Sequence, residues 1–303
     1  MPAQDFRAYL PPLPSALPAV LQAQCCCPLH PLTHADGKAK PVRKRGGKVQ
    51  RRGITQIDLS GPTKDYFGDM TKLTDASSDA IRKALLADID KLLPPLEDGD
   101  DAEAIKGRSL KQIARSVKQA HKRIEKLQSF AERTAKSAAS TTQQVHKSQQ
   151  AAQLAQIGIE VFNETPGLPK IMGEFVRVNT KLIKSIPRDE LRRVEAILVD
   201  AVKRGRRHES VAKDIAAEFD IAENRAALIA RDQVGKANSD LSKSRMIANG
   251  VDKAIWRVIA PGESRVRETH AAREGRVYKI ANGVDGVHPG DEVQCRCYAE
   301  PLV

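Results

Sequence analysis

The residues most suited to chemistry lie near the C-terminal end of the sequence, and they are His270, His288, Cys295 and Cys297. Two imidazoles and two thiolates can hold a zinc ion in a tetrahedral structural site. In a regular strand the two cysteines would point to the same face, so that both sulfur atoms could reach one metal. The spacing predicts a structural zinc site. A second interpretation stays open, in which His270 makes local hydrogen bonds and the thiols pack in a small core.

No catalytic motif accompanies these four residues. The sequence has no G-x-x-x-x-G-K-[ST] phosphate loop, no G-x-S-x-G nucleophile motif and no H-E-x-x-H metalloprotease motif. An enzyme that uses zinc-activated water would need an open coordination position, and we identify no general base beside the site. The sequence therefore favours a protein that is not an enzyme over a zinc-dependent enzyme.

The elements around these residues are predicted to be short strands. The segments AIWRVIA (254–260), GRVYKI (275–280) and CRCYAEPLV (295–303) are apolar and β-like, and turn residues such as PGES follow the first of them. They predict a small C-terminal α+β cap on a protein that is otherwise mainly α.

Upstream, apolar residues recur at helical spacing. A helix is expected over about 75–93, before Pro94 and Pro95. A longer helix with a heptad-like seam should follow and pack on another helix. The seam consists of Leu110, Ile113, Val117, Ala120, Ile124, Leu127 and Ala131. The outer faces of this helix are basic, and a solvated surface is favoured over a DNA-binding stripe for Lys106, Arg108, Lys111, Arg115, Lys118, Lys122, Arg123 and Lys126.

The segment NETPGLP (163–169) predicts a domain boundary, because two prolines and a glycine interrupt the periodicity. A helix is then expected to start near Ser185 and Pro187 and to end at Gly205. A short helix over 209–219, a turn at Asp220 and a long helix ending at Gly250 should follow. This last pair has the spacing of a helix-turn-helix, although its second helix is far longer than a usual recognition helix.

Composition and charge indicate the general class of protein. The chain has 303 residues, of which 41% are hydrophobic, 29% charged and only 4% aromatic, which favours long helices over a compact β-rich domain. The net charge of +12 supports contact with polyanions such as DNA. Five cysteines in two groups make a poor disulfide framework and favour a reducing compartment, the bacterial cytoplasm. No apolar stretch of membrane-spanning length is present.

Residues 1–60 are predicted to form a disordered basic arm, rich in proline and glycine. Such an arm can neutralise phosphates without fixed geometry, and the alternative is a solubilising tail. The candidate nucleic-acid contacts are Arg43, Lys44, Arg45, Lys48, Arg51 and Arg52. The expected organisation is therefore this arm, a helical region over 61–162 that contains the heptad-like helix, and a last domain over 165–303.

Residues 165–303 resemble the head-morphogenesis domain of the phage Mu protein F-like family. The shared features, in chain order, are Arg231 and Asp232 in a helix, a Gly250–Val251 turn, Trp256 and Arg257 in a strand, Arg267, His270 and Gly275 in one segment, and finally His288, Pro289, Cys295, Arg296 and Cys297. Many relatives have a C-x-x-C pair where this chain has Arg267 to His270, so only His270 is left there as a ligand.

The resemblance implies a phage minor head (capsid) protein that acts in head morphogenesis without catalysis. It also implies a location inside the virion head near the portal, after assembly in the host bacterial cytoplasm. Its partners would be the portal protein and other head proteins, and its basic regions would contact packaged DNA. A DNA-binding protein acting through the basic arm or the helix-turn-helix-like unit is the alternative function.

Overall fold

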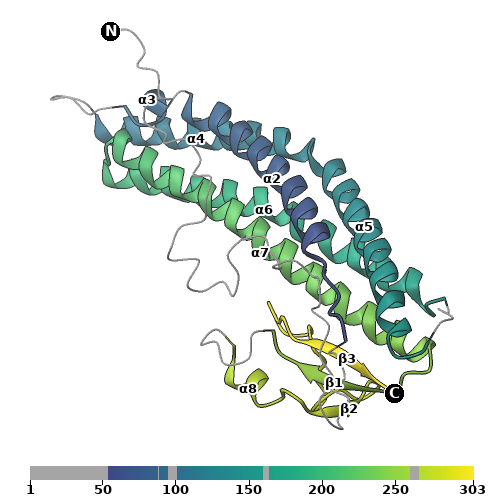
Figure 1. The fold of residues 1–303 in the computed structure, drawn as a ribbon. Coiled ribbons are helices and arrows are strands. Elements are labelled where there is room, and N and C mark those ends of the chain that lie inside the picture. The colour runs from purple at the N-terminus through teal and green to yellow at the C-terminus, as the bar shows by residue number, and fades with distance from the viewer. Residues whose placement is uncertain (1–53, 88, 95–100, 160–163, 260–265) are drawn as a thin grey trace, which may run out of the picture. The chain divides into compact units, whose positions relative to one another are not determined.

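The computed structural model describes residues 54–87, 89–94, 101–159, 164–259 and 266–303. The described chain is mainly helical, with long helices followed by a small antiparallel sheet, which confirms the predicted fold class (Figure 1). The predicted arm, with all six of its candidate nucleic-acid contacts, falls outside the described residues apart from its last seven positions.

Two compact units make up the described chain, and neither is one continuous stretch. Unit 1 contains the described residues of Lys64–Ala139 and Gly173–Arg231, and unit 2 contains 54–63 and the described residues of Ser140–Met172 and Asp232–Val303. Six helices run through them before the sheet: α2 (Ser60–Ile81), α3 (Ile89–Leu92), α4 (Ala102–Glu125), α5 (Gln128–Ala155), α6 (Leu168–Arg204) and α7 (His208–Ala248).

The first described helix, α2, starts at Ser60 and not near residue 75. The Asp58 side chain accepts a hydrogen bond from the backbone N–H of Ser60, at 2.8 Å, and so satisfies a donor at the helix start. Pro62 is compatible with this start, because residues of the first turn need no backbone N–H donor. A π-helical turn, η2 (Arg82–Leu86), then follows α2.

Helix α6 runs without interruption through Pro187, so the predicted helix start near Ser185 is wrong. A proline inside a helix costs about 3 kcal/mol. Ile183, Ile186 and Pro187 itself are buried, and their packing offsets that cost. The predicted stop at Gly205 is confirmed, since α6 ends at Arg204 and Gly205 has a positive φ of 63°.

Helix α7 is also continuous, and the predicted turn at Asp220 does not form. The helical spacing of buried residues continues across Asp220. Steps of four, three and four residues separate Ile215, Phe219, Ala222 and Ala226, so they form one apolar stripe along a single helix. The helix-turn-helix-like unit is therefore not formed, and the part of the alternative function that depended on it falls away.

The core of unit 1 uses most of the predicted heptad seam. Ile113, Ala120 and Ile124 of α4 are buried in one cluster with residues of α6 and α7, which include Leu191, Val194, Leu198, Ile215 and Phe219. The seam does not lie on a single helix, because α4 ends at Glu125 and α5 begins at Gln128.

A carboxyl group is buried in unit 1. Glu190 has no exposed surface, and its carboxyl oxygens accept hydrogen bonds from the hydroxyls of Ser77, at 3.1 Å, and Ser78. Burial raises the pKa of Glu190 to about 7, although the hydrogen bonds from Ser78 and Ser77 act in the opposite direction. The folded chain therefore holds a proton here at pH values where the unfolded chain has released it.

We expect Glu190→Gln to become stabilising relative to the wild type as the pH rises. A carboxyl whose folded pKa is raised contributes its full stability below its unfolded pKa, and loses it as the pH rises through the folded value of about 7. The difference in unfolding free energy between variant and wild type should shift by about 3 kcal/mol from pH 4 to pH 8. Urea unfolding at both pH values measures this, with Glu195→Gln on the same helix as control. A difference that does not change with pH would contradict the prediction.

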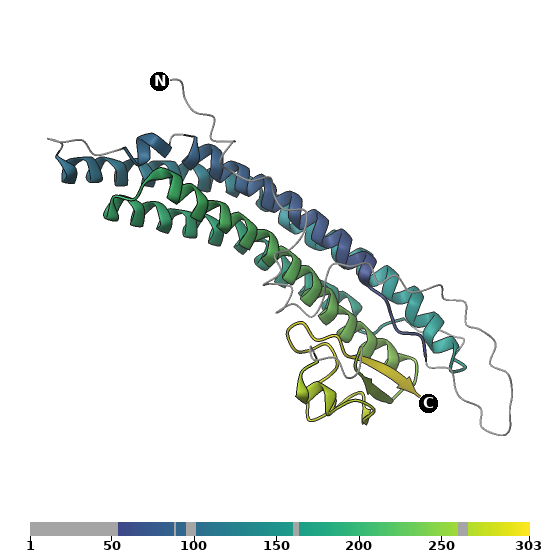
Figure 2. The same cartoon turned by 60° about the vertical axis from the view of Figure 1, so that its left-hand side comes forward.

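Unit 2 contains the sheet. Its strand order is β2 (Val277–Lys279), β1 (Lys253–Arg257) and β3 (Tyr298–Leu302), and both pairings are antiparallel. β2 and β3 lie within segments that are predicted to be β-like, and β1 begins one residue before the predicted segment 254–260. Figures 1 and 2 both show the sheet beside the short helix α8 (Glu268–Ala271). The sheet packs through Trp256 on Leu154 of α5 and Met246 of α7, and all three side chains are fully buried.

A buried polar network joins α5 and α7 within unit 2. The guanidinium group of Arg245, which is fully buried, donates to His146 Nδ1, to the Thr165 hydroxyl at 3.1 Å and to the Gln143 carbonyl at 3.3 Å. Burial, with a further contribution from the charge of Arg245, lowers the pKa of His146 to about 3. The imidazole is therefore neutral at physiological pH and can accept at Nδ1.

Candidate metal centre

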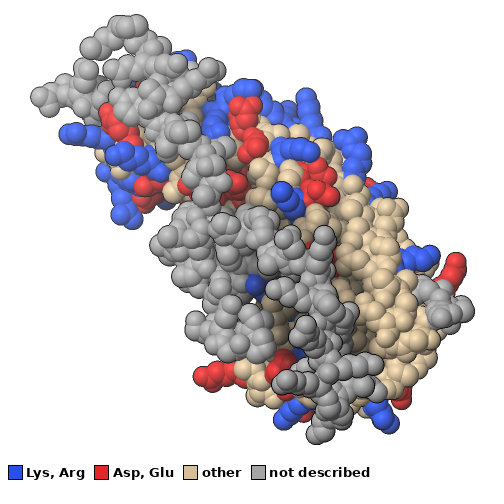
Figure 3. All heavy atoms as spheres, in the orientation of Figure 1, with Lys and Arg blue, Asp and Glu red and all other residues tan. Residues whose placement is uncertain are grey.

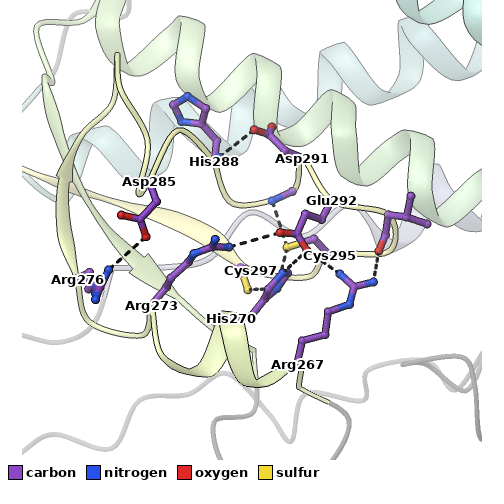
Figure 4. A network of polar contacts seen from close by, with 12 residues as sticks. Arg267, His270, Arg273, Arg276, Asp285, His288, Asp291, Glu292, Cys295 and Cys297 are labelled. Carbon is purple, nitrogen blue, oxygen red and sulfur yellow. Dashed lines mark hydrogen bonds and ion pairs between the residues drawn. The ribbon is translucent and has the colours of Figure 1, made fainter.

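Three of the predicted ligand residues meet in unit 2 (Figure 4). His270 lies on α8, and Cys295 and Cys297 lie in the segment that leads into β3. His270 Nδ1 is 3.5 Å from Cys295 Sγ and 3.4 Å from Cys297 Sγ, and the three ligand atoms all lie within 4.8 Å of one another. His270 and Cys297 are buried, and Cys295 is half-buried.

This geometry fits a tetrahedral metal ion. Zinc binds sulfur at about 2.3 Å and imidazole nitrogen at about 2.0–2.1 Å, so tetrahedral angles place nitrogen and sulfur about 3.5 Å apart. The two observed N···S distances, 3.5 and 3.4 Å, agree with that separation. The group could therefore bind a metal such as zinc, with a fourth ligand that these three residues do not supply.

The far side of the His270 ring is held by a carboxylate. His270 Nε2 is 2.7 Å from Glu292 Oε2, and Arg267 Nη1 is 3.2 Å from the same oxygen. Metal-binding histidines usually donate their second ring N–H to such a group, which fixes the tautomer and the ring orientation. With Nε2 occupied in this way, Nδ1 faces the two thiols, and Glu292 completes the arrangement expected around a histidine ligand.

The two thiols act as a pair. Hydrogen bonding to Cys297 lowers the pKa of Cys295, to which the backbone N–H of Gly290 also donates, at 3.3 Å. Hydrogen bonding to Cys295, together with burial, raises the pKa of Cys297. Cys295 therefore loses its proton more readily than Cys297 does, and the thiolate is the form that binds metals.

His288, the fourth predicted ligand, is not part of this group. Its Nε2 lies 3.0 Å from Lys243 Nζ, and its ring packs edge-on against Tyr278 with centroids 6.3 Å apart. Figure 4 shows the ring turned away from the two sulfur atoms. Burial and the charge of Lys243 lower the pKa of His288. The structure therefore brings together His270, Cys295 and Cys297, and places His288 on the surface of α7.

Close approach to α7 positions the loop before the thiols. Gly290 has a φ of 97°, and a Cβ atom on it would lie 2.8 Å from the Cβ of Ser239, so only glycine fits there. Asp232 accepts a hydrogen bond from the backbone N–H of Gln294, at 2.8 Å, and pairs with Lys236. The sequence identified Asp232 only through the family resemblance, and it gave no role to Gly290.

The remaining motif residues support the sheet and its turns. Trp256 is fully buried, lies edge-on to His270 with centroids 5.9 Å apart, and has the Arg273 guanidinium 5.2 Å from its ring centroid. Gly275 has a φ of 74° and donates its N–H to the Trp256 carbonyl at 2.9 Å. Pro289 is buried in the loop, Arg231 lies on α7, and Arg296 lies between the two cysteines.

The fold and site define a class of protein: a long-helix protein with a small C-terminal sheet that encloses a His-Cys-Cys group. Comparison with known proteins adds a family. Residues 192–300 match the family described as Phage Mu protein F like protein, and this range contains the His-Cys-Cys group and most of the sheet. The chain therefore carries a Phage Mu protein F-like domain.

A relative from Haemophilus influenzae strain Rd, named only as an uncharacterized protein, is 34% identical over 156 residues. The match covers 49% of this chain and 34% of the relative. No solved structure matches. Among the described helices, none combines the length and the apolar character needed to cross a membrane.

Proposed function

We propose that this chain is a phage minor head protein that acts in head morphogenesis. It would bind the portal protein and other head proteins in the host bacterial cytoplasm and stay in the virion head near the portal. The observation that carries the proposal is the family match over residues 192–300. The proposed role is structural and not catalytic. Two polar groups beside the site fit such a role, because Glu292 holds the His270 ring and Asp232 holds the backbone of Gln294.

We also propose that His270, Cys295 and Cys297 hold a structural zinc ion. A zinc ion bound there would supply a cross-link between α8 and the segment that leads into β3. The three residues provide the donor types and spacing that zinc requires, and Glu292 orients the imidazole. Such a cross-link suits a sheet of only three short strands, because so small a sheet buries little apolar surface.

Cosedimentation with portal oligomers tests the proposed function. The full-length chain would be mixed with assembled portal protein from the same phage or prophage and centrifuged through a gradient. We expect the chain to travel with the portal, and to stay at the top of the gradient with the portal of an unrelated phage. Failure to travel with its own portal under assembly conditions would overturn the proposal.

Contact with packaged DNA belongs to the same proposal. The charge of +12 supports it, and it would use the basic regions of the chain. The arm residues Arg43 to Arg52 are one candidate region. The basic side chains on helices α4 and α6 of unit 1 are another candidate region.

A further inference from the structure

Unit 1 has a groove of about 350 Å³ between α4 and α6. Its floor includes Val117 and Leu191, and the side chains around it include Lys118 and His121 of α4 and Arg188 and Arg192 of α6. These four are exposed at the surface. Both helices are held in place here by the core of unit 1, in which Ala120 of α4 and Leu191 and Val194 of α6 are buried together.

Three of the cations in this groove have no acidic partner. Within the described chain, Lys118, Arg188 and Arg192 make no ion pair within 4.0 Å. Neighbouring charged residues of α6 do form ion pairs, since Arg193 pairs with Glu218 and Asp189 pairs with Arg225. Glu218 and Asp189 are thus paired with other cations, and Glu195 is the one acidic residue among those that line the groove. The groove keeps a positive charge available to a ligand.

The charge continues along α4 beyond the groove. Lys111, Arg115, Lys118 and Lys122 follow one another at helical steps of three or four and are all exposed. The basic residues of α4 extend from Lys106 to Arg123, which is about 25 Å of helix at 1.5 Å per residue. Figure 3 shows Lys and Arg side chains, with Asp and Glu among them, over the part of unit 1 near α3 and α4.

We propose that this groove and the adjoining face of α4 bind the phosphate backbone of double-stranded DNA. The inference rests on the proposed function and adds the surface that would contact packaged DNA. The unpaired cations lie on two helices, with Lys118 on α4 and Arg188 and Arg192 on α6. Such an arrangement suits a ligand with regularly repeated negative charges. An acidic peptide is the other anionic ligand, but the basic face is longer than the groove, and the apolar floor offers few side chains to anchor a peptide.

Salt-dependent binding of the full-length chain to linear duplex DNA tests this surface. The variant Lys118→Gln/Arg188→Gln/Arg192→Gln should lower the slope of log affinity against log salt by about 3, since each phosphate contact contributes about 0.9. At 0.1 M salt the affinity should fall on the order of a hundredfold. The variant Lys118→Arg/Arg188→Lys/Arg192→Lys keeps the charge, and it should bind nearly as the wild type does.

The matched control is Lys72→Gln/Lys83→Gln/Lys136→Gln. It removes the same charge from exposed positions of unit 1 where each lysine already pairs with an acid, at 2.9, 2.6 and 2.7 Å. We expect its slope to stay close to that of the wild type. Circular dichroism of each variant checks that the helices are retained, and the exposed positions of the groove cations favour that result.

A groove variant that keeps the wild-type slope would overturn the inference. Polyglutamate is the probe for an acidic protein ligand. A groove variant that keeps its DNA affinity but no longer binds polyglutamate would also overturn the inference, because the groove would then bind an acidic protein. Replacing Arg43, Lys44 and Arg45 by glutamine measures the contribution of the arm separately. Failure to bind the portal, with DNA binding still dependent on the groove, would refute the proposed function and leave this inference standing.

Discussion

Replacing Cys295 and Cys297 by serine is expected to remove zinc from the protein and to lower its stability. The change removes two of the three candidate metal ligands and leaves only His270. A ligand that binds only the folded chain stabilises it by about 4 kcal/mol when its concentration is a thousand times its dissociation constant. Loss of zinc should therefore cost several kcal/mol in unit 2, because hydroxyl groups are poor zinc ligands.

Metal content and thermal unfolding together measure this effect. Wild-type protein prepared with zinc should hold about one ion per chain, and its unfolding temperature should fall when a strong chelator is added. His270→Asn should behave like the cysteine variant. Wild-type protein that stays zinc-free, with a stability that neither zinc nor chelator changes, would refute the proposed metal centre.

Two variants separate this site from other zinc ligands in the chain. Replacing Cys25, Cys26 and Cys27 by serine removes the other cysteines of the sequence and should leave the zinc content unchanged. His288→Asn removes the ligand that the sequence predicted but the structure places beside Lys243. It should also retain zinc. A loss of zinc in His288→Asn would restore the four-ligand site expected from the sequence.

Trp256→Ala should destabilise the folded chain by about 3–5 kcal/mol, the usual cost of truncating a buried aromatic side chain. Trp256 is fully buried on the central strand, where it packs on Leu154 and Met246 and touches His270 and Tyr278. Its removal would leave a cavity between the sheet and two helices of unit 2. The edge-on contact with His270 predicts a weaker metal affinity as well.

Denaturant unfolding of the full-length variant measures the loss, and Val277→Ala is its control. Val277 lies on β2 of the same sheet and is 57% exposed, so its truncation should change stability by no more than about 0.5 kcal/mol. A loss of less than 1 kcal/mol in Trp256→Ala would mean that the sheet is not anchored through this residue.

Local patterns in the sequence predicted the three strands near the site, but not the short helix α8 that carries His270. Turn residues and short apolar runs indicated all three strands, because both signals depend on a few adjacent residues. The two histidines and the C-x-C spacing indicated a candidate metal site with four ligands, although they could not distinguish it from a small thiol core. The structure brings three of those four residues together. The ends of the helices were predicted less well. Helix α2 starts at Ser60, well before the predicted start, and α6 and α7 continue through Pro187 and Asp220, where a helix start and a turn were predicted.

The sequence by itself determined a helical protein with a small C-terminal sheet and the chemical types of three candidate metal ligands, because periodicity, turn residues and side-chain chemistry are local properties. Only the tertiary structure decided that His288 faces Lys243, that Glu292 holds the His270 ring, and that the helices continue through Pro187 and Asp220. Each of those outcomes depends on packing between residues far apart in the chain, whose burial outweighs local preferences of a few kcal/mol.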